Sequence, residues 1–384
     1  MTLGIFTVMT AELLPVGLLT PAAADLAVSE GTAALMVTVP GLVAALAAPL
    51  VTVRAAGADR RALLVGLLLL AAAANLVSAL AGHLAVVLAA RVLLGIAIGG
   101  FWALAGGLAP RLVPAGAVGR ATAVIFGGVS AASVLGVPAG TLLTERAGWR
   151  WAFAATGLLA LLAAAALRTL LPRLPGRGAG TGAEPSPTGR SGAGTLLALP
   201  RRNRRVRAGL LLTLALVTGH FLAYSFVRPL LTDRSGISGS LLGALLLGYG
   251  VAGVAGNFLA GSRAARSPNR TLAVIAAALG TVLLAGFLLG GSAIAGAGLL
   301  LLWGLAYGGV SVALQSWFMA AAPDDVETAT GLNVSVFCLA IALGALLGGF
   351  LVDAYSLGTV LLAGAALTLA AFPVAVLSGR NDPS

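Results

Sequence analysis

The sequence predicts an all-α integral membrane protein with twelve transmembrane helices, arranged as two pseudo-symmetric six-helix bundles. Three observations support this. Hydrophobic residues make up 59% of the chain and charged residues only 9%, the apolar runs are about 20 residues long, and the two halves of the chain match each other. A soluble domain has roughly 25% charged residues, so a soluble fold lacks the charge to cover this much apolar surface. Runs of this length predict membrane-spanning helices.

Each of the twelve apolar runs is long enough to cross about 30 Å of hydrocarbon, so we predict one span for each. The expected spans are 2–23, 32–52, 62–81, 84–108, 121–143, 150–171, 207–231, 238–261, 271–290, 293–318, 328–351 and 356–377. Residues 172–206 are rich in Pro, Gly, Ser and Arg, which predicts a flexible cytoplasmic linker. The chain then divides into an N-terminal six-helix bundle over 1–171, this linker, and a C-terminal six-helix bundle over 207–384.

The placement of the basic residues predicts how the spans are oriented. All 23 basic residues are arginine, and most lie in segments that face one side of the membrane if the N-terminus is cytoplasmic. Cytoplasmic segments carry the excess of basic residues in membrane proteins, so both termini are expected inside a bacterial cytoplasmic membrane. The net charge of +11 then comes from arginines that orient the spans in the membrane, so no nucleic-acid partner is expected.

The two halves of the chain match at a constant offset of 208 residues. Acidic residues and prolines are scarce in this chain, so matches between them carry weight. The matching pairs are Pro21 with Pro229, Asp25 with Asp233, and Glu145 with Asp353. Parallel six-span repeats are a transporter architecture, in which the binding site lies between the halves near the middle of the bilayer.

Several stretches resemble motifs of one transporter family. GRATAVIFGGVSAASVLGVPAGTLLTERAGWRWAF, residues 119–153, resembles the fifth-helix antiporter motif of the major facilitator superfamily, with Gly136, Pro138 and Gly140 at its core. AARVLLGIAIGGFWAL, residues 89–104, resembles the fourth-helix motif with its membrane-embedded arginine. The resemblance covers essentially the whole chain and implies the major facilitator fold.

The opening of the chain indicates a branch within that family. ELLPVGLLTPAAADLAVSEGTA, residues 12–33, resembles the opening of bacterial drug:proton antiporters of the twelve-span type. Together with the GGFWAL stretch, LVP at 112–114 and VRP at 227–229, it is similar to the purine ribonucleoside efflux pumps and the neighbouring sugar-efflux permeases. This resemblance implies export of a small molecule.

The loop after the second span departs from the family pattern. That loop usually reads G-x-L-x-D-R-x-G-R-R, whereas this chain has VTVRAAGADRRALL at 51–64. Asp59, Arg60 and Arg61 are retained, but the spacing of the glycine and the leucine is not. The resemblance implies a cytoplasmic gate loop at these three residues, and the changed spacing counts against that role.

Glu12 lies about halfway along the first expected span. A charged side chain at mid-bilayer costs at least about 2.5 kcal/mol on insertion scales, so it usually faces protein or water rather than lipid. Burial favours the protonated form of a carboxyl group, which would let Glu12 load and release protons. The hypothesis is a proton or substrate site, and the alternative is a neutral acid that hydrogen-bonds a neighbouring helix.

Two more candidates for proton coupling lie within spans. Arg91 is expected about 10 Å from the outer end of the fourth span, within reach of Glu12 if the first and fourth spans pack together. The resemblance implies a proton-relay role for Arg91, and the alternative is a fixed charge that anchors the span. The offset of 208 places His220 opposite Glu12, either as a titrating group or as a buried neutral histidine that donates one hydrogen bond.

The small residues around Gly136, Pro138 and Gly140 allow neighbouring helices to approach closely, and Pro138 removes a backbone hydrogen bond and can bend the fifth span. We expect this span to pack tightly against the eighth and to seal the inner side in one state. The resemblance to the major facilitator superfamily implies further that this seal favours exchange of substrate for protons over a leak of either one. Ordinary helix packing is the alternative.

Aromatic and polar residues of several spans are candidates for a central cavity, where they would stack on a planar or amphipathic substrate. Outside the cavity they would be lipid-facing anchors or interhelical hydrogen-bond partners, and Trp317 is expected to be an anchor near the inner end. The cavity candidates are Phe101, Trp102, Tyr224, Arg228, Tyr307, Gln315 and Asn333.

The expected function is secondary active transport, as proton-coupled efflux of a nucleoside, sugar or drug by alternating access. A proton-coupled importer or a uniporter shares most of these features. A non-transporting sensor or scaffold would ordinarily need a soluble domain, which the linker is too small to form. The sequence shows no catalytic constellation and has two histidines and one cysteine, so we expect no enzyme and no metal. The chain also lacks the lysine that a P-loop needs, which disfavours ATP hydrolysis, so no cofactor is expected and the proton gradient is the expected energy source. A monomer is expected, with protons and a small-molecule substrate as partners.

Overall fold

The computed structural model describes residues 1–54, 58–105, 108, 112–114, 124–125, 127–129, 131–174, 193–237, 240–264 and 266–379. Within these residues, twelve helices are long and apolar enough to cross a membrane. The regular structure of this described part is helical throughout. The predicted fold class, an all-α membrane protein with twelve spans, is therefore confirmed.

The N-terminal half supplies six spans, of which the second and fifth consist of more than one helical piece. Its elements are α1 (Thr2–Asp25), α2 (Glu30–Ala33), α3 (Leu35–Arg54), α4 (Arg60–Leu80), α5 (Leu84–Ala105), the π-helical turn η2 (Ala132–Gly136), α8 (Val137–Ala147) and α9 (Trp149–Leu170). Residues 121–123, 126 and 130 of the predicted fifth span lie outside the described residues. The described part of this span ends at Ala147 rather than at residue 143.

The C-terminal half supplies the other six spans, and its fourth is divided at Gly309 into two helices. Its elements are α10 (Ala193–Arg202), α11 (Arg204–Tyr224), α12 (Val227–Pro229), the π-helical turn η4 (Leu230–Arg234), α13 (Ser240–Ala264), α14 (Pro268–Leu289), α15 (Ala293–Gly308), α16 (Val310–Ala321), α17 (Val326–Ala354) and α18 (Leu357–Gly379). Most of the predicted ends differ from these by only a few residues.

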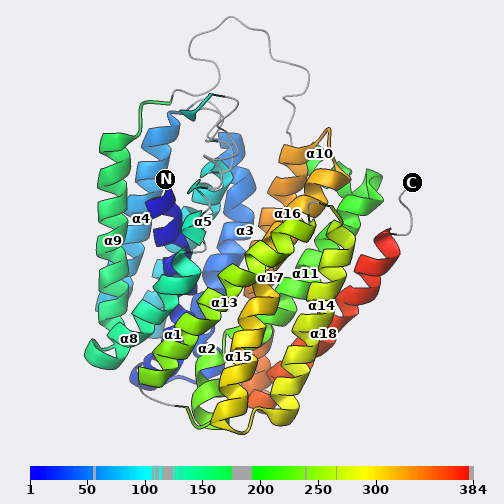
Figure 1. The fold of residues 1–384 in the computed structure, drawn as a ribbon. Helices are drawn as coiled ribbons and strands as arrows, with labels where there is room; N and C mark the ends of the chain where they lie inside the picture. Colours follow the sequence, from blue (N-terminus) through cyan, green and yellow to red (C-terminus); the bar gives the residue numbers. More distant parts are fainter. Residues whose placement is uncertain are drawn as a thin grey trace, which may run out of the picture.

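The two halves lie side by side, with the earlier helices on one side and the later helices on the other (Figure 1). They meet where α3 packs against α17, where α13 packs against η2 and α8, and where α1 packs against α12. We call the end of the bundle that carries residues 26–29 and 355–356 the outer end, following the arginine-based prediction. The opposite end, where α4 begins at Arg60, is the inner end.

Glycines allow helices to approach backbone to backbone in two places. In the interface between the halves, a Cβ atom on Gly349 would lie 2.7 Å from the carbonyl oxygen of Gly31. Within the C-terminal half, Gly304 and Gly308 of α15 lie directly against the backbone of α13 at Tyr249 and Gly253. A side chain at any of these positions would push the two helices apart, because the neighbouring atoms belong to the backbone and cannot rotate away.

Residues 193–202 form α10, although they fall in the segment predicted to be a flexible linker. Leu199 packs against the apolar core, and this packing stabilises a helix that would be too short to form alone. Asn203 then caps α11 by accepting from the backbone N–H groups of Arg205 and Val206, and donates to the carbonyl of Ala321 at 2.8 Å. The division into two bundles and a linker stays a prediction, and residues 175–192 lie outside the described residues.

Candidate functional site

Glu12 lies near the middle of α1 and is only 2% exposed. In the described part of the chain, its Oε1 atom has no hydrogen-bond partner. Its carboxyl group lies within electrostatic range of the Tyr307 hydroxyl and the Cys338 thiol, which both belong to the C-terminal half. A buried carboxyl group thus faces the opposite half of the protein without a fixed partner.

Arg91 is buried as well, but it does not form the predicted ion pair with Glu12 among the described residues. Its Nη1 atom donates to the backbone carbonyl of Ala11 at 3.0 Å, and its guanidinium carbon lies 4.5 Å from the ring centre of Phe153. The guanidinium therefore binds the backbone beside Glu12 instead of the carboxylate. The expectation of a direct Glu12–Arg91 pair was wrong because it considered side chains alone.

A proline explains why Arg91 binds a backbone carbonyl. In an α-helix, the carbonyl of residue i accepts from the N–H of residue i+4. Pro15 lies four residues after Ala11 inside α1, and proline has no N–H to donate. The Ala11 carbonyl would otherwise be an unpaired acceptor in an apolar region, where such a group is costly. Arg91 supplies the missing donor and joins α5 to α1 one residue from Glu12.

His220 is held in one protonation form by its neighbour. Trp303 Nε1 lies 3.0 Å from His220 Nδ1, and an indole N–H can only donate. His220 Nδ1 must therefore be an unprotonated acceptor, which makes this histidine neutral with its proton on Nε2. One of the two alternatives predicted for His220 was a neutral histidine that donates a hydrogen bond; in this bond, His220 is neutral and accepts.

The His220 ring lies within a cluster of aromatic side chains from α11, α13 and α15, which we call the aromatic cluster. Its ring stacks on Tyr307 with centres 3.4 Å apart and on Tyr224 with centres 4.8 Å apart. Tyr224 in turn stacks on Tyr249, with centres 4.9 Å apart. Tyr307 is half-buried whereas the other rings are buried, so Tyr307 forms the accessible edge of the aromatic cluster. Tyr249 was not among the predicted site residues, because it is the only tyrosine in a long apolar span and no motif marks it.

Three of the predicted cavity or anchor residues have structural contacts instead. Phe101 is buried, and its ring packs against Gly4 of α1. Asn333 and the hydroxyl of Thr213 are 2.8 Å apart, which joins α17 to α11. Trp317 is buried and donates to the carbonyl of Arg205 at 3.0 Å, so it is not a lipid-facing anchor. Each of these contacts lies within one half of the protein. The polar groups of Asn333 and Trp317 are hydrogen-bonded, as buried polar groups usually are.

The other cavity candidates differ in their surroundings. Trp102 and Gln315 are half-buried, and Tyr224 belongs to the aromatic cluster. Arg228 reaches across to the N-terminal half, where its Nη1 donates to the carbonyl of Gly17 at 2.9 Å. Arg228 thus joins the two halves, which the prediction of a cavity residue did not include.

The loop residues Asp59, Arg60 and Arg61 join helices of the N-terminal half. Asp59 accepts from the backbone N–H of Arg61 at 2.9 Å and of Leu174 at 3.1 Å, and Arg61 donates to the carbonyl of Leu171 at 3.0 Å. Burial acts to raise the pKa of Asp59, but these backbone N–H groups and the charge of Arg61 hold it below its ordinary value. The loop therefore fastens α4 to the end of α9, and its predicted gate role stays a prediction.

The glycines of the predicted antiporter motif face α1. A Cβ atom on Gly136 would meet Thr10, and one on Gly140 would meet Leu14. Span 5 also packs against span 8, where a Cβ atom on Gly243 of α13 would lie 2.7 Å from Leu142, near the outer end. The expected packing of these two spans is present, but in the described residues it lies toward the outer end rather than the inner one.

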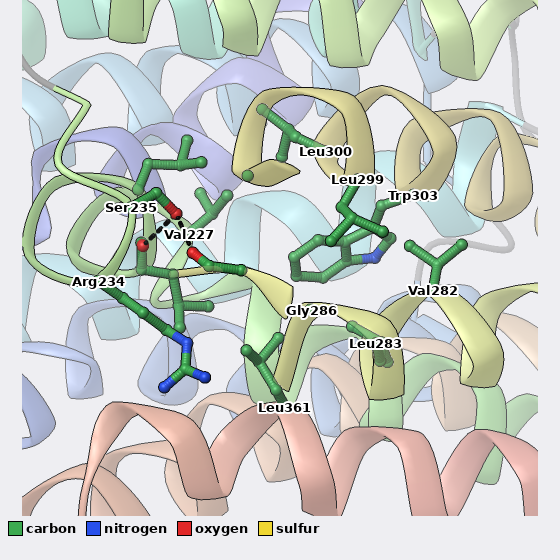
Figure 2. A pocket seen from close by; sticks show the side chains of 14 residues that line it. Val227, Arg234, Ser235, Val282, Leu283, Gly286, Leu299, Leu300, Trp303 and Leu361 are labelled. Carbon is green, nitrogen blue, oxygen red and sulfur yellow. Dashed lines mark hydrogen bonds between the residues drawn. The ribbon is translucent and has the colours of Figure 1, made fainter. Parts of the chain in front are cut away.

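A crevice at the outer part of the C-terminal half is lined mainly by leucines and valines (Figure 2). Trp303 forms part of its wall, so the same indole contacts both this crevice and the aromatic cluster. The hydroxyl of Ser235 already donates to the carbonyl of Gly290 at 2.8 Å, with the carbonyl of Leu230 at 3.3 Å. Polar ligands need several convergent polar groups, so we place no substrate here.

These observations define a class: a helical membrane protein with twelve spans, whose two halves meet around a buried carboxyl group and an aromatic cluster. The chain belongs to the Major Facilitator Superfamily, since the model of that family matches residues 1–345. It is thus a transporter, embedded in a membrane by many spans, and not an enzyme.

Two curated relatives match most of the chain and carry different functional names. The chain is 35% identical to the "Transcription regulatory protein OpdE" of Pseudomonas aeruginosa over 378 residues, covering 98% of this chain and 92% of that protein. It is 34% identical to the "Purine ribonucleoside efflux pump NepI" of Escherichia coli strain K12 over 358 residues, covering 93% of this chain and 87% of that protein.

Two solved transporters share the fold at low identity. A bacterial homologue of the human lysosomal transporter Spinster, in an inward-facing and occupied conformation, has a TM-score of 0.78 and 16% identity, covering 99% of this chain and 96% of that one. The human organic anion transporter MFSD10 has a TM-score of 0.67 and 20% identity, covering 97% of each chain.

Proposed function

We propose that the protein exports a small molecule with a planar ring, such as a purine nucleoside, in exchange for protons. The observation that carries this proposal is the buried carboxyl group of Glu12, which faces the opposite half without a hydrogen-bond partner among the described residues. An ionised carboxylate is costly in such surroundings, whereas the neutral acid is not. Loss of its proton is then favourable only when the cavity admits water or another polar group.

Alternating access turns this property into coupling. When the two halves rock about the site, Glu12 is exposed first to one side of the membrane and then to the other. Protonation from the outside and release to the inside would drive the return of the empty transporter. Arg91 is assigned a positioning role, because it binds the Ala11 carbonyl and fixes α1 beside Glu12.

The substrate class is supported by the aromatic cluster and by the named relatives. Tyr307 offers a half-buried ring at the edge of the aromatic cluster, and stacked rings recognise planar ligands. Several relatives are named as purine ribonucleoside efflux pumps. Nucleosides are therefore the first candidates, followed by sugars and amphipathic drugs. Trp102 and Gln315 stay cavity candidates.

The arginine distribution supports a location and an orientation in the membrane. We assign the protein to a bacterial cytoplasmic membrane with both termini inside, since most arginines then lie in cytoplasmic segments. A single chain contains both halves that form the site, so a monomer is sufficient. The proton gradient is the only energy source that the assigned residues require.

Inside-out vesicles that contain the full chain test the proposal. With an imposed gradient that is acid inside, a radiolabelled purine nucleoside is expected to accumulate in the vesicles, and an uncoupler is expected to abolish the accumulation. Equilibration of the nucleoside across the membrane at a rate independent of the pH gradient would instead identify a uniporter. Accumulation only in vesicles of the opposite orientation would identify an importer.

A second candidate function, a membrane sensor, is favoured only by the name of one relative, which is a transcription regulatory protein. Liposomes containing the purified chain distinguish the two functions. Flux of a nucleoside, sugar or drug that depends on the protein supports transport. A chain that binds such a molecule but gives no flux of any screened compound supports the sensor.

A further inference from the structure

Helix α1 contains a second carbonyl that a proline leaves without its helical donor. Pro21 lies inside α1, four residues after Gly17, so the Gly17 carbonyl has no N–H partner at the i+4 position. Arg228 supplies a donor to this carbonyl at 2.9 Å. The arrangement repeats the one at Ala11, where the partner is Arg91, but with one difference: Arg91 belongs to the same half as α1, and Arg228 belongs to the opposite half.

The other charged neighbours of Arg228 also lie in the N-terminal half. Its guanidinium is attracted by the carboxylates of Glu145, near the end of α8, and of Glu30, at the start of α2. Arg228 is half-buried, which reduces the screening of these attractions by water. One arginine of the C-terminal half is thus bound to the N-terminal half by a backbone hydrogen bond and by two charges.

A second contact joins the halves at the same end of the protein. Asp353, near the end of α17, accepts from the hydroxyl of Ser29 at 2.6 Å and from the backbone N–H of Gly31 at 3.1 Å. Its carboxylate thus lies at the N-terminus of α2, where N–H groups are free and negative charge is favoured. Between pairs of described residues, the hydrogen bonds that cross from one half to the other all involve Arg228 or Asp353.

We propose that Arg228 is the outer latch of the transporter: it occupies the acceptor that Pro21 frees on Gly17, and so stabilises the state in which the outer end is closed. When the outer end opens, the halves separate there and this bond breaks. The Gly17 carbonyl must then be hydrated by water that enters the outer cavity. Pro21 and Arg228 together therefore set the balance between the outward-open and outward-closed states.

The test measures the opening of the outer end directly. Spin labels are attached to His83→Cys and Ser292→Cys, which lie in exposed outer loops of the two halves, in a Cys338→Ala background. Double electron–electron resonance on the full chain in nanodiscs, without substrate, gives the ratio of open to closed protein. Loss of a charge-assisted hydrogen bond corresponds to about a tenfold change in such a ratio. Arg228→Gln is therefore expected to raise the ratio of open to closed protein about tenfold.

A double-mutant cycle identifies the acceptor. Pro21→Ala returns an N–H to α1, so the Gly17 carbonyl is satisfied within the helix in both states. Arg228→Gln is then expected to change the ratio less than about threefold, because only the attraction to the carboxylates remains. Arg234→Gln is the matched control, since Arg234 binds the carbonyl of Phe287 within its own half. This control is expected to leave the ratio unchanged.

Two results would overturn the proposal. One is an Arg228→Gln variant with the same open fraction as the wild type and the Arg234→Gln control. The other is an effect of Arg228→Gln that is equally large with proline and with alanine at position 21. A monodisperse elution profile for each variant separates either result from misfolding. The measurement uses no substrate, so it stands apart from the proposed nucleoside efflux.

Discussion

The two halves of the protein differ in how the polar side chains buried near their centres are hydrogen-bonded. In the N-terminal half, Glu12 and Arg91 are buried, and Glu12 Oε1 together with Arg91 Nε and Nη2 has no hydrogen-bond partner among the described residues. In the C-terminal half, His220 has a tryptophan donor and is stacked between two tyrosines. The N-terminal half thus buries two ionisable side chains whose hydrogen-bonding capacity is partly unused, whereas the C-terminal half surrounds its buried histidine with a neutral aromatic cluster.

The proposed exchange of a substrate for protons assigns a different task to each half. A buried group with unused hydrogen-bonding capacity is sensitive to the arrival of water, a proton or a ligand, because each of these removes a large cost. A histidine held as an acceptor between stacked rings gains nothing from a second proton, since protonation would break its bond to Trp303. The proposed function therefore assigns proton exchange to the N-terminal half and the stacking of a planar substrate to the C-terminal half.

The largest effect is expected from Glu12→Gln, which keeps the shape of the side chain but cannot exchange a proton. A positioned proton-transfer group contributes about 100-fold or more to a rate, so gradient-driven accumulation in inside-out vesicles should fall by at least this factor. Substrate exchange without a gradient should persist. Glu12→Asp, which retains a carboxyl group, is the control. If Glu12→Gln accumulated the nucleoside as the wild type does, with an unchanged pH profile, the assignment of proton exchange to Glu12 would be wrong.

Next in size is the effect of Arg91→Met, which leaves the Ala11 carbonyl without a donor. An unsatisfied buried acceptor costs about 1–3 kcal/mol, so the thermal unfolding temperature should fall and transport should weaken with it. In a Pro15→Ala background, the helix satisfies this carbonyl, and the loss on Arg91→Met should be smaller. An equal loss in both backgrounds would mean that the contact with Phe153, rather than the carbonyl, accounts for the role of Arg91.

A smaller effect is expected from Trp303→Phe, which removes the donor to His220 and keeps a ring. Aromatic pairs contribute about 0.5–1.5 kcal/mol beyond their buried area, so the KM for a nucleoside should rise by up to about tenfold. The pH dependence of coupling should not change. If the pH dependence shifted in Trp303→Phe but not in a Tyr249→Phe control, we would conclude that His220 in the C-terminal half also takes part in proton exchange.

The smallest effect is expected from Asp59→Ala at the inner end. Removal of an N-cap side chain costs about 1 kcal/mol, so thermal stability should fall slightly while coupling is unchanged. The pKa of Asp59 is lowered in the folded protein. Its stabilising contribution is therefore complete above the ordinary pKa of aspartate and is lost as the pH falls through the lowered value. Uncoupled transport in Asp59→Ala would instead support a gate role.

The sequence was sufficient for the spans and for the burial of Glu12 within the protein, because both follow from the cost of placing polar groups in hydrocarbon. It failed for the partner of Arg91, since that partner is a backbone carbonyl and a comparison of side chains does not include it. The signal was available: Pro15 lies four residues after Ala11, and Pro21 four after Gly17. The offset of 208 placed His220 opposite Glu12, but the form of the histidine depends on Trp303, which comes from a distant span.

A carbonyl freed by a proline is also a simple unit of evolutionary change. A single substitution to proline creates an acceptor at a known position, four residues earlier, without adding a polar side chain to the lipid-facing surface. An arginine elsewhere in the fold then determines whether that acceptor ties a helix to its own bundle or to the other one. Relatives that share this fold can thus differ in how easily they open through the gain or loss of one proline, with every substrate-contacting residue unchanged.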